Sequence, residues 1–600
     1  MFISVLVLLT IVGLSEEMMI RVNQGPLKSH TTKVGRHAIY VFKNIPYAKQ
    51  PVGNLRFERP EDHDGWLSED ELPVHSKIRC PQHEFYDDEE EFDSSLGQED
   101  CLYLDIYLRK DSDIGNMSLP VVVYFHGGLF RRGSKEDYGP DFLLRYSNII
   151  LVVPNYRLGI LGFLSHQDGD LPGNLGLWDQ NAALKWVSKN IEYFGGDPLR
   201  VTIAGHEAGA ASVGLHILAS ASHDYFQGAV SDSGTALTPW LIDTDPQSSA
   251  VPEVAKNLHC STNSKDEMLQ CLKTVPLKDI LAAQGHLNKI AFLPTVDNMA
   301  ENPFIPYHPK TLYERGYQKN VNYLIGFTEN EASFEVAREF PKVLKYHHLD
   351  KMIHHFLQPY FKNAINFEAI VTAAKYHYLR GIMIPTFESM EPQIAKLMTD
   401  FLYQSPLHQV LRLHRQKTGN VFVYVFKKDG KSCGLENRKC FGNEYYVFNA
   451  SHENIDDEMQ PDVRRAIETV SKVWGDFISS GHPDERKVWQ RVLNVDELHY
   501  AEISDIMEPK ARPWSDDSEF WISLVSDLQA AGNVSVEPLD DIQAVSEYST
   551  IGTWGAAGLA ILCGVLCVAL VGLVVITKRR TLTMSLGKVS NPKDLRISRG

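Results

Sequence analysis

Most of the chain lacks any sign of division into small domains. Of its 600 residues, those between about 20 and 530 contain no long linker rich in proline, glycine and serine, no low-complexity block and no repeat. This excludes a string of small modules and a solenoid, because both leave such marks in a sequence. One large domain, expected over residues 17–531, is therefore the simplest organisation.

Positive charge is scarce. The chain has 59 lysines and arginines against 76 aspartates and glutamates, a net charge of −17. Residues 578–600 contribute +6, which leaves −23 on the remainder. An acidic surface of this kind disfavours nucleic acid as a partner and favours cationic ligands or basic protein patches. Acidity that serves solubility alone stays open as an alternative.

Long hydrophobic runs are confined to the two ends. The run from Phe2 to Leu14 is too short to span a bilayer, and we interpret residues 1–16 as a signal peptide. The uncharged run from Gly555 to Thr577 is long enough to cross roughly 30 Å of hydrocarbon as a helix. The basic residues in 578–600 predict a cytosolic tail, with residues 532–554 as a stalk. We therefore expect a single-pass type I protein of the cell membrane with an extracellular domain.

Cysteine is also sparse, and its placement agrees with this topology. Two of the eight cysteines, Cys563 and Cys567, fall in the predicted membrane helix and six precede it. Six extracellular cysteines permit three disulfides. Candidate glycosylation sites at Asn116, Asn449 and Asn533 lie on the same side of the predicted span.

The large domain alternates short apolar runs with helical patterns. Such runs, rich in β-branched residues, are typical of a parallel sheet covered on both faces. They include 121–125, 149–153, 201–204, 323–325 and 421–425. A helical pattern starts near Ala208, directly after the third run. Strand, tight turn and helix in that order are the geometry of a nucleophile elbow.

Several motifs carry a family resemblance. In family order they are Asn44–Ala48, Glu99–Leu104, His126–Gly128, Asn155–Gly159, Leu177–Leu184, Phe194–Pro198, Val201–Ser212 and Phe520–Trp521. With these motifs the chain resembles the type-B carboxylesterase and cholinesterase family. The resemblance implies an α/β-hydrolase fold, with a central, mostly parallel sheet covered by helices.

The same alignment of motifs points to a degenerate catalytic triad. Active members of the family carry G-x-S-x-G at the elbow, and this frame, Gly205–Gly209, has Glu207 in place of serine. The family's acid matches Glu331, but its histidine matches Phe441. Serine catalysis needs a hydroxyl, a histidine that removes its proton and a carboxylate that orients the histidine. We therefore expect no catalytic residue here, and a protein that is not an enzyme.

Other parts of the family's site are partly retained. The resemblance places the former oxyanion hole at Gly127, Gly128 and Ala208, although Leu129 stands where a third glycine is expected. We expect Glu207 mainly to stabilise the start of the following helix, where free N–H groups and the helix dipole attract a carboxylate. Ligand binding in a residual pocket is the alternative, and neither His206 nor Ser233 is expected to rebuild a site.

The resemblance also implies disulfide pairings. It matches Cys80 with Cys101 and Cys260 with Cys271, and it places Ser405 and Ser518 where a third family bridge would be. The remaining two extracellular cysteines, Cys433 and Cys440, are close in sequence and most simply pair with each other.

The whole architecture resembles a branch of the family that includes the neuroligin-, neurotactin- and gliotactin-like proteins. This resemblance implies adhesion or a cell-surface receptor function through an extracellular protein ligand, and a homodimer. Two alternatives stay open: a small-molecule sensor on an inactive hydrolase, and a membrane-bound carboxylesterase with unusual residual activity. No cofactor or metal is expected.

Overall fold

A computed structural model describes residues 17–82, 97–116, 118–166, 169, 171–242, 250–285, 292–333, 336, 346–361, 364–382, 386–414, 419–427, 444–448, 461–493, 497–513 and 516–532. The chain divides into two compact units, Met1–Gly532 and Asn533–Gly600, and every described residue belongs to the first. The predicted signal peptide, membrane helix and tail lie outside the described residues. Within the described part, no helix combines the length and the apolar character needed to cross a membrane.

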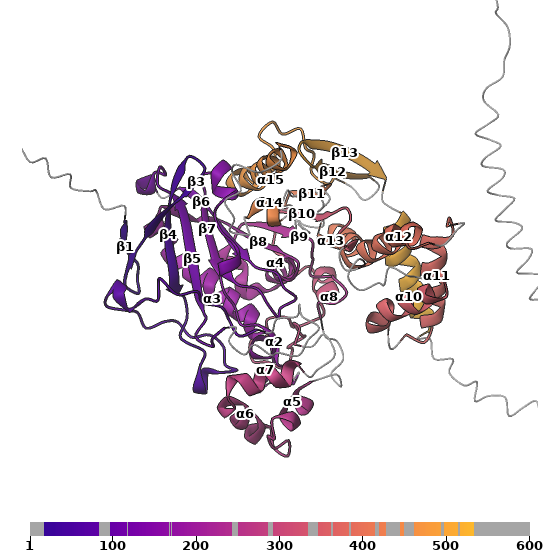
Figure 1. Cartoon of the computed structure of the whole chain (residues 1–600), viewed down its shortest axis with the longest axis horizontal. Coiled ribbons are helices and arrows are strands. Elements are labelled where there is room, and N and C mark those ends of the chain that lie inside the picture. The colour runs from indigo at the N-terminus through magenta and orange to yellow at the C-terminus, as the bar shows by residue number, and fades with distance from the viewer. Residues whose placement is uncertain are drawn as a thin grey trace, which may run out of the picture. The chain divides into compact units, whose positions relative to one another are not determined.

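An eleven-stranded sheet forms the centre of the first unit (Figure 1). Its strand order is β13-β12-β11-β10-β9-β8-β6-β7-β5-β4-β3. In chain order the strands are β3 (His30–Val34), β4 (His37–Pro46), β5 (Tyr103–Arg109), β6 (Leu119–Phe125), β7 (Ile150–Pro154), β8 (Gly196–His206), β9 (Gly228–Asp232), β10 (Asn322–Thr328), β11 (Val421–Phe426), β12 (Glu497–Ile503) and β13 (Met507–Pro513). A separate antiparallel pair joins β1 (Met19–Arg21) to β2 (Pro26–Lys28).

The sheet is parallel in its middle and antiparallel at its edges. Every pair from β12 through β11, β10, β9, β8 and β6 to β7 is parallel. The pairs β3/β4, β4/β5, β5/β7 and β12/β13 are antiparallel. The predicted mostly parallel sheet is therefore confirmed, and all five apolar runs singled out in the sequence are strands of it.

The central strands are apolar on both faces because both faces are covered. In β6, Val121, Val123 and Phe125 belong to one buried cluster, whereas Val122 and Tyr124 belong to another. Successive side chains of a strand point to opposite faces, so the sheet separates two cores. A strand buried on both faces needs a continuous apolar run, which is why these strands were visible in the sequence.

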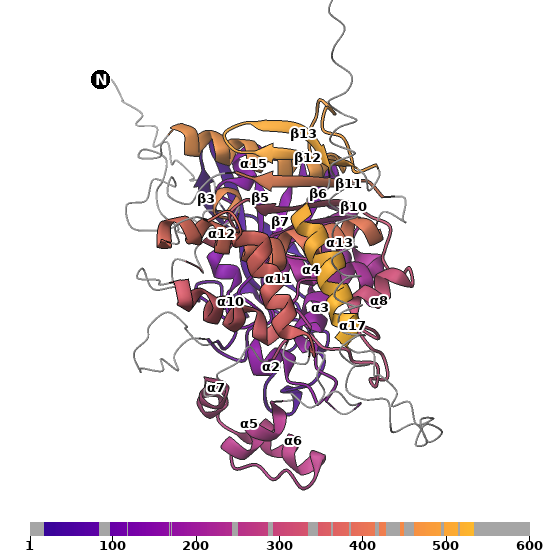
Figure 2. The same cartoon turned by 90° about the vertical axis from the view of Figure 1, so that its right-hand side faces the viewer.

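Helices form the two outer layers (Figure 1 and Figure 2). Those described are α1 (Leu143–Tyr146), α2 (Gly159–Phe163), α3 (Leu175–Asn190), α4 (Ala208–Leu218), α5 (Val251–Asn257), α6 (Lys265–Thr274), α7 (Leu277–Gly285), α8 (Pro309–Glu314), α10 (Tyr346–Phe361), α11 (Phe367–Leu379), α12 (Phe387–Thr399), α13 (Ser405–His414), α14 (Glu444–Val447), α15 (Pro461–Ser480), α16 (Asp516–Glu519) and α17 (Ser526–Gly532). Helices α3 and α4 contact the strands from one side, and their residues share a core cluster. Helix α15 packs with the other cluster, around the fully buried Trp474.

A group of helices stands beyond one end of this core. Figure 1 shows α10, α11 and α12 together with α17, away from the strands β3 to β5. Contacts join α10 to α11, α11 to α12 and α11 to α17. The π-helical turn Asp400–Gln404 links α12 to α13, and a second π-helical stretch, Phe520–Val525, precedes α17. Here Gln404 donates a hydrogen bond to Ser518, one of the two serines that the resemblance places where a third family bridge would be.

Candidate active site

The elbow is a strained turn between β8 and α4. Strand β8 ends at His206, α4 begins at Ala208, and Glu207 between them has φ 51° and ψ −110°. Such a conformation costs a residue with a side chain on the order of 1–3 kcal/mol and is found mainly at functional sites. Two glycines make the turn possible, because a Cβ on Gly205 would lie 2.3 Å from the carbonyl carbon of Gly209, and one on Gly209 would lie 2.0 Å from Phe125 O.

The Glu207 carboxylate occupies the position between two backbone donors of another loop. Its Oε2 accepts a hydrogen bond from Gly128 N at 2.7 Å and one from Leu129 N at 3.1 Å. The side chain makes no capping hydrogen bond to α4. The expected hydrogen bond from the first N–H groups of α4 to Glu207 is thus not made, because the N–H groups of residues 128 and 129 bind this carboxylate instead.

A buried histidine supports the donor loop, which is the loop that contains Gly128 and Leu129. His126 Nδ1 donates to Gly127 O at 2.9 Å, and its ring stacks on Tyr156 with centroids 4.3 Å apart. Burial lowers the pKa of His126 to about 4, so the ring is neutral at physiological pH. Gly128 and Leu129 both have positive φ angles, 105° and 55°. In this turn the N–H groups of both residues point to the same atom, Glu207 Oε2.

A second polar cluster lies at the ends of the neighbouring strands. Ser233 Oγ donates to Glu331 Oε2 at 2.8 Å, and Thr328 N donates to the same oxygen at 2.7 Å. Asp232 bonds to His206 Nδ1 at 3.0 Å and accepts the Tyr424 hydroxyl at 2.5 Å. Loss of solvent raises the pKa of Glu331 to about 8, against the opposing attraction of His206. The Glu331 carboxyl is therefore mostly protonated at neutral pH and can donate a hydrogen bond.

The structure brings some of the predicted residues together. Glu207 and Gly128 are in direct contact, Gly127 directly precedes Gly128, and Ala208 opens α4 beside Glu207. Glu331 joins Ser233 rather than Glu207 among the hydrogen bonds described. Phe441 lies outside the described residues.

Leu129 lies at the oxyanion-hole position that the resemblance gave it, and its backbone N–H is one of the two donors. One part of the site was missed by the sequence interpretation. The partner of His206 is Asp232, the last residue of β9. A signal for it existed, since polar residues at the carboxyl end of a strand beside the elbow strand commonly face a site.

The disulfides and glycosylation sites are placed as follows. Cys80 bonds to Cys101 and Cys260 to Cys271, as the resemblance implies. Cys433, Cys440, Asn449 and Asn533 lie outside the described residues, and Asn116 ends the short 3₁₀-helix Ile114–Asn116.

Chemically, the elbow combines a carboxylate, two converging N–H donors and a strained backbone. The donors would bind an oxyanion if the carboxylate moved away from them, because they would then be left without an acceptor. The carboxylate itself could accept a proton from water. These are components of acyl-transfer chemistry, although Glu207 stands where the resemblance leads us to expect a serine hydroxyl as the nucleophile.

Comparison with known proteins places this geometry in a family. The Carboxylesterase family model matches residues 16–521. The chain belongs to the carboxylesterase family. It is 28% identical over 531 residues to "Carboxylesterase 5A" of Homo sapiens, covering 85% of this chain and 89% of the relative. It is 30% identical over 520 residues to "Esterase FE4" of Myzus persicae, covering 80% and 87%.

Two further relatives are matched over a smaller part of their length. The "Carboxylic ester hydrolase" of Bombus ignitus is 39% identical over 312 residues, which cover 50% of this chain and 54% of the relative. The "Bile salt-activated lipase" of Rattus norvegicus is 32% identical over 421 residues, which cover 66% and 65%. The chain thus spans between half and two thirds of the length of these two carboxylesterase-family proteins.

The names of these relatives correct one expectation. They are ester hydrolases, esterases and lipases, which point to an enzyme and contradict the expectation that the chain is not one. That expectation equated the absence of serine and histidine with the absence of a site. The structure keeps the strained elbow, the paired N–H donors and a carboxylate at the nucleophile position.

Proposed function

We propose that the chain hydrolyses a carboxylic ester at the elbow, with the Glu207 carboxylate in the position that the family resemblance gives to a serine. The observation that carries the proposal is the contact of Glu207 with Gly128 and Leu129, because it puts a carboxylate and an oxyanion-binding pair at one point. The ester hydrolase, esterase and lipase names of the relatives support the class of reaction.

The proposed reaction uses water and balances without a cofactor. Glu207 swings away from the N–H pair, and the ester carbonyl oxygen takes its place. Glu207 then removes a proton from a water molecule, whose oxygen attacks the carbonyl carbon. The N–H groups of Gly128 and Leu129 stabilise the oxyanion that forms. When the ester bond breaks, Glu207 returns the proton to the leaving alkoxide, so that an acid and an alcohol are released.

The test is hydrolysis of 4-nitrophenyl butyrate by the full-length chain and by Glu207→Gln. We expect turnover above the buffer rate that falls at least 100-fold in the variant, since an amide cannot accept the proton from water. Glu253→Gln, an exposed acid on α5, is the matched control and should keep the rate. Equal rates for Glu207→Gln and the unchanged chain, or no turnover at all, would reject the proposal.

A second candidate is protein recognition at a cell surface, in adhesion or as a receptor, as the resemblance to the neuroligin-, neurotactin- and gliotactin-like branch implies. The −23 charge outside residues 578–600 favours it, because an acidic surface attracts basic partners. Cells that display the full chain should then cluster or bind a partner. Cells that display the Glu207→Gln variant should do so equally well. If only cells with an unchanged Glu207 cluster, recognition depends on the elbow instead.

A further inference from the structure

A cavity outside the elbow lies between the loop after β9 and the helical group. Residues of the 236–242 loop form one side, and residues of α10, α13 and the segment from Trp521 to Gln529 form most of the other. The elbow residues Glu207, Ser233 and Glu331 are not among the described residues that line it. Its volume is about 320 Å³, near the lower end of the range for small-molecule sites, so it suits a ligand of one ring.

Uncharged polar side chains of two neighbouring helices face this cavity. Ser526 and Gln529 lie three residues apart on α17 and so share one face of that helix, and Gln409 lies on α13. Ser526 is exposed and the two glutamines are half-buried, so all three stay accessible to a molecule in the cavity. Within the described part of the chain, no hydrogen bond joins these three side chains to another residue. Their hydrogen-bonding groups are therefore available to a ligand.

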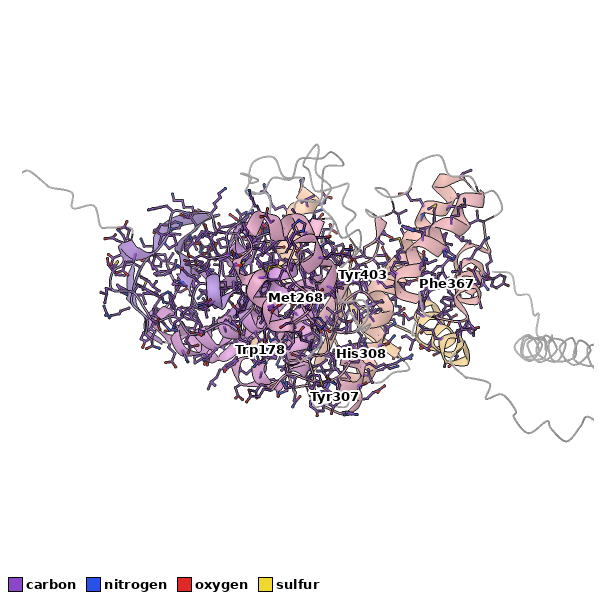
Figure 3. All side chains as sticks on the ribbon, turned by 90° about the horizontal axis from the view of Figure 1, so that it is seen from below. Trp178, Met268, Tyr307, His308, Phe367 and Tyr403 are labelled. Carbon is purple, nitrogen blue, oxygen red and sulfur yellow. A yellow bond between two sulfur atoms is a disulfide. The ribbon has the colours of Figure 1, made fainter. Side chains whose placement is uncertain are left out.

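These groups both donate and accept hydrogen bonds without carrying charge. An amide or a hydroxyl offers a donor and an acceptor within one side chain, as the hydroxyl groups of a ligand do. His308, labelled in Figure 3, also lines the cavity, and loss of solvent lowers its pKa. Its Nδ1 accepts a hydrogen bond from Lys310 N at 3.3 Å, which leaves the proton of the neutral ring on Nε2 as a further donor.

The lining has no formal charge. Among the described residues that line the cavity there is no aspartate, glutamate, lysine or arginine. A charged ligand would lose its hydration without gaining an opposite charge in return. The cavity therefore favours an uncharged ligand.

An apolar floor accompanies the polar side chains. Phe361, Phe401 and Trp521 line the cavity, and the Phe401 ring centroid lies 4.7 Å from that of Trp521 and 5.7 Å from that of Phe361. Each of the three residues is only 5% to 7% exposed, so the rings leave a narrow apolar surface, too small for a flat aromatic ligand to stack on. Such a surface is wide enough for a few C–H groups.

We propose that this cavity binds a neutral pyranose sugar, with its hydroxyl groups at Gln409, Ser526 and Gln529 and its C–H groups on the floor formed by Phe401 and Trp521. A pyranose is a single ring that combines a rim of hydroxyl groups with an apolar C–H face, and the cavity has both kinds of surface. The ring can come from a free monosaccharide or from the end of a glycan. The site is separate from the elbow and does not depend on ester hydrolysis.

The test is saturation-transfer NMR on the full-length chain in a detergent that has no sugar headgroup. The ligands are the methyl glycosides of glucose, galactose, mannose and N-acetylglucosamine, with the methyl glycoside of glucuronate as the charged control. We expect saturable binding of at least one neutral glycoside and none of the glucuronate. No saturable binding of any of the four, or binding of the glucuronate as tight as that of the glucoside, would overturn the proposal.

A second measurement distinguishes the two sources of the ring. It uses a neutral oligosaccharide that ends in the sugar found to bind. Binding of the oligosaccharide at least as tight as that of the methyl glycoside would support the end of a glycan as the ligand. Binding of the methyl glycoside alone would support a free monosaccharide.

Variants of the lining locate the binding. Gln409→Ala and Gln529→Ala should each raise the Kd about twofold to tenfold, the effect of one lost hydrogen bond. Gln490→Ala, at an exposed glutamine that does not line the cavity, is the matched control and should leave the Kd unchanged. Ser526→Trp, also at an exposed position, should keep the melting temperature and abolish binding by filling the mouth. Unchanged Kd values in both glutamine variants, or unchanged binding in Ser526→Trp, would overturn the assignment.

Discussion

Glu207 illustrates how a strained residue is held in place at the scale of single atoms. Its positive φ is unfavourable, but the turn delivers its carboxylate to two N–H groups that lie 78 and 79 residues away in the chain. Without this carboxylate the two N–H groups would have no hydrogen-bond acceptor. The strain of the elbow and the hydrogen bonds of the donor loop therefore support one another.

This mutual support predicts a loss of stability in Glu207→Ala. Removal of the carboxylate leaves two partly buried N–H groups unsatisfied, and we expect the free energy of unfolding to fall by about 1–3 kcal/mol. Glu207→Gln should lose less, because its amide oxygen can still accept both hydrogen bonds. Urea denaturation followed by fluorescence measures the difference. Equal loss in the two variants would mean that the N–H pair finds another acceptor.

Glu331 predicts a dependence of stability on pH. The unfolded carboxyl releases its proton near its ordinary pKa of 4.5, whereas the folded protein holds it up to about pH 8. The folded state binds more protons between these values, so the free energy of unfolding should fall as pH rises through this window. The slope should be at most about 1.4 kcal/mol per pH unit.

Glu331→Gln provides the comparison, since its side chain is neutral at every pH. From pH 5 to pH 8 the melting temperature of the unchanged chain should fall steadily relative to that of this variant. A difference that stays constant over that range would contradict the raised pKa.

The residue scale also shows what a sequence can and cannot predict about this site. The frame Gly205–Gly209 identified Glu207 as the elbow residue, because the two glycines are required by close backbone contacts. The destination of the Glu207 carboxylate was not predictable, since it depends on backbone N–H groups of a distant loop. Leu129 was identified only as the residue in place of a third glycine, because a leucine side chain does not indicate what its main-chain N–H binds.

At the scale of elements, the donor loop is anchored to the sheet by the short 3₁₀-helix Lys135–Asp137. Lys135 is fully buried and its Nζ lies 3.0 Å from Asp105 Oδ1 on β5. Its backbone N–H donates to Asn155 Oδ1 at 2.8 Å. Burial alone would raise the pKa of Asp105, but Lys135 and Lys43 outweigh it and hold that pKa below its ordinary value. A charged pair in the core thus fixes the end of the loop.

We expect Lys135→Met to destabilise the fold by about 3 kcal/mol, because it leaves a buried carboxylate with only one of its two cations. The double variant Lys135→Met with Asp105→Asn should recover part of this loss by removing the uncompensated charge. Thermal melts of the two variants measure both effects. A double variant less stable than the single one would indicate that Asp105 stabilises the sheet independently of Lys135.

The strands differ in how well they can be predicted from the sequence. The parallel strands β6, β7, β8, β10 and β11 contain continuous apolar runs and were found as such, whereas β9, which ends in Ser231 and Asp232, was not. The edge strand β3, His30–Val34, has one buried residue among five and lacks that pattern. It belongs to the sheet because it pairs with β4 in antiparallel register, and its own hydrophobic pattern would not have identified it as a strand. The strand order, too, results from packing that no single run encodes.

At the scale of the whole molecule, the extracellular location remains a prediction from the sequence. The uncharged run from Gly555 to Thr577 and the +6 charge of residues 578–600 place the large domain outside and the tail inside. The two disulfides described, Cys80–Cys101 and Cys260–Cys271, are consistent with an oxidising compartment.

We expect the full chain to stay with membranes during alkaline carbonate extraction, because transfer of an uncharged helix of this length out of the bilayer would expose its apolar side chains to water. A chain that ends at residue 554 should instead be secreted in soluble form. An epitope after Gly600 should be hidden on intact cells, whereas one after residue 17 should be accessible. Retention of the shortened chain in the membrane fraction would move the anchor elsewhere, and an exposed C-terminal epitope would reverse the orientation that the basic tail predicts.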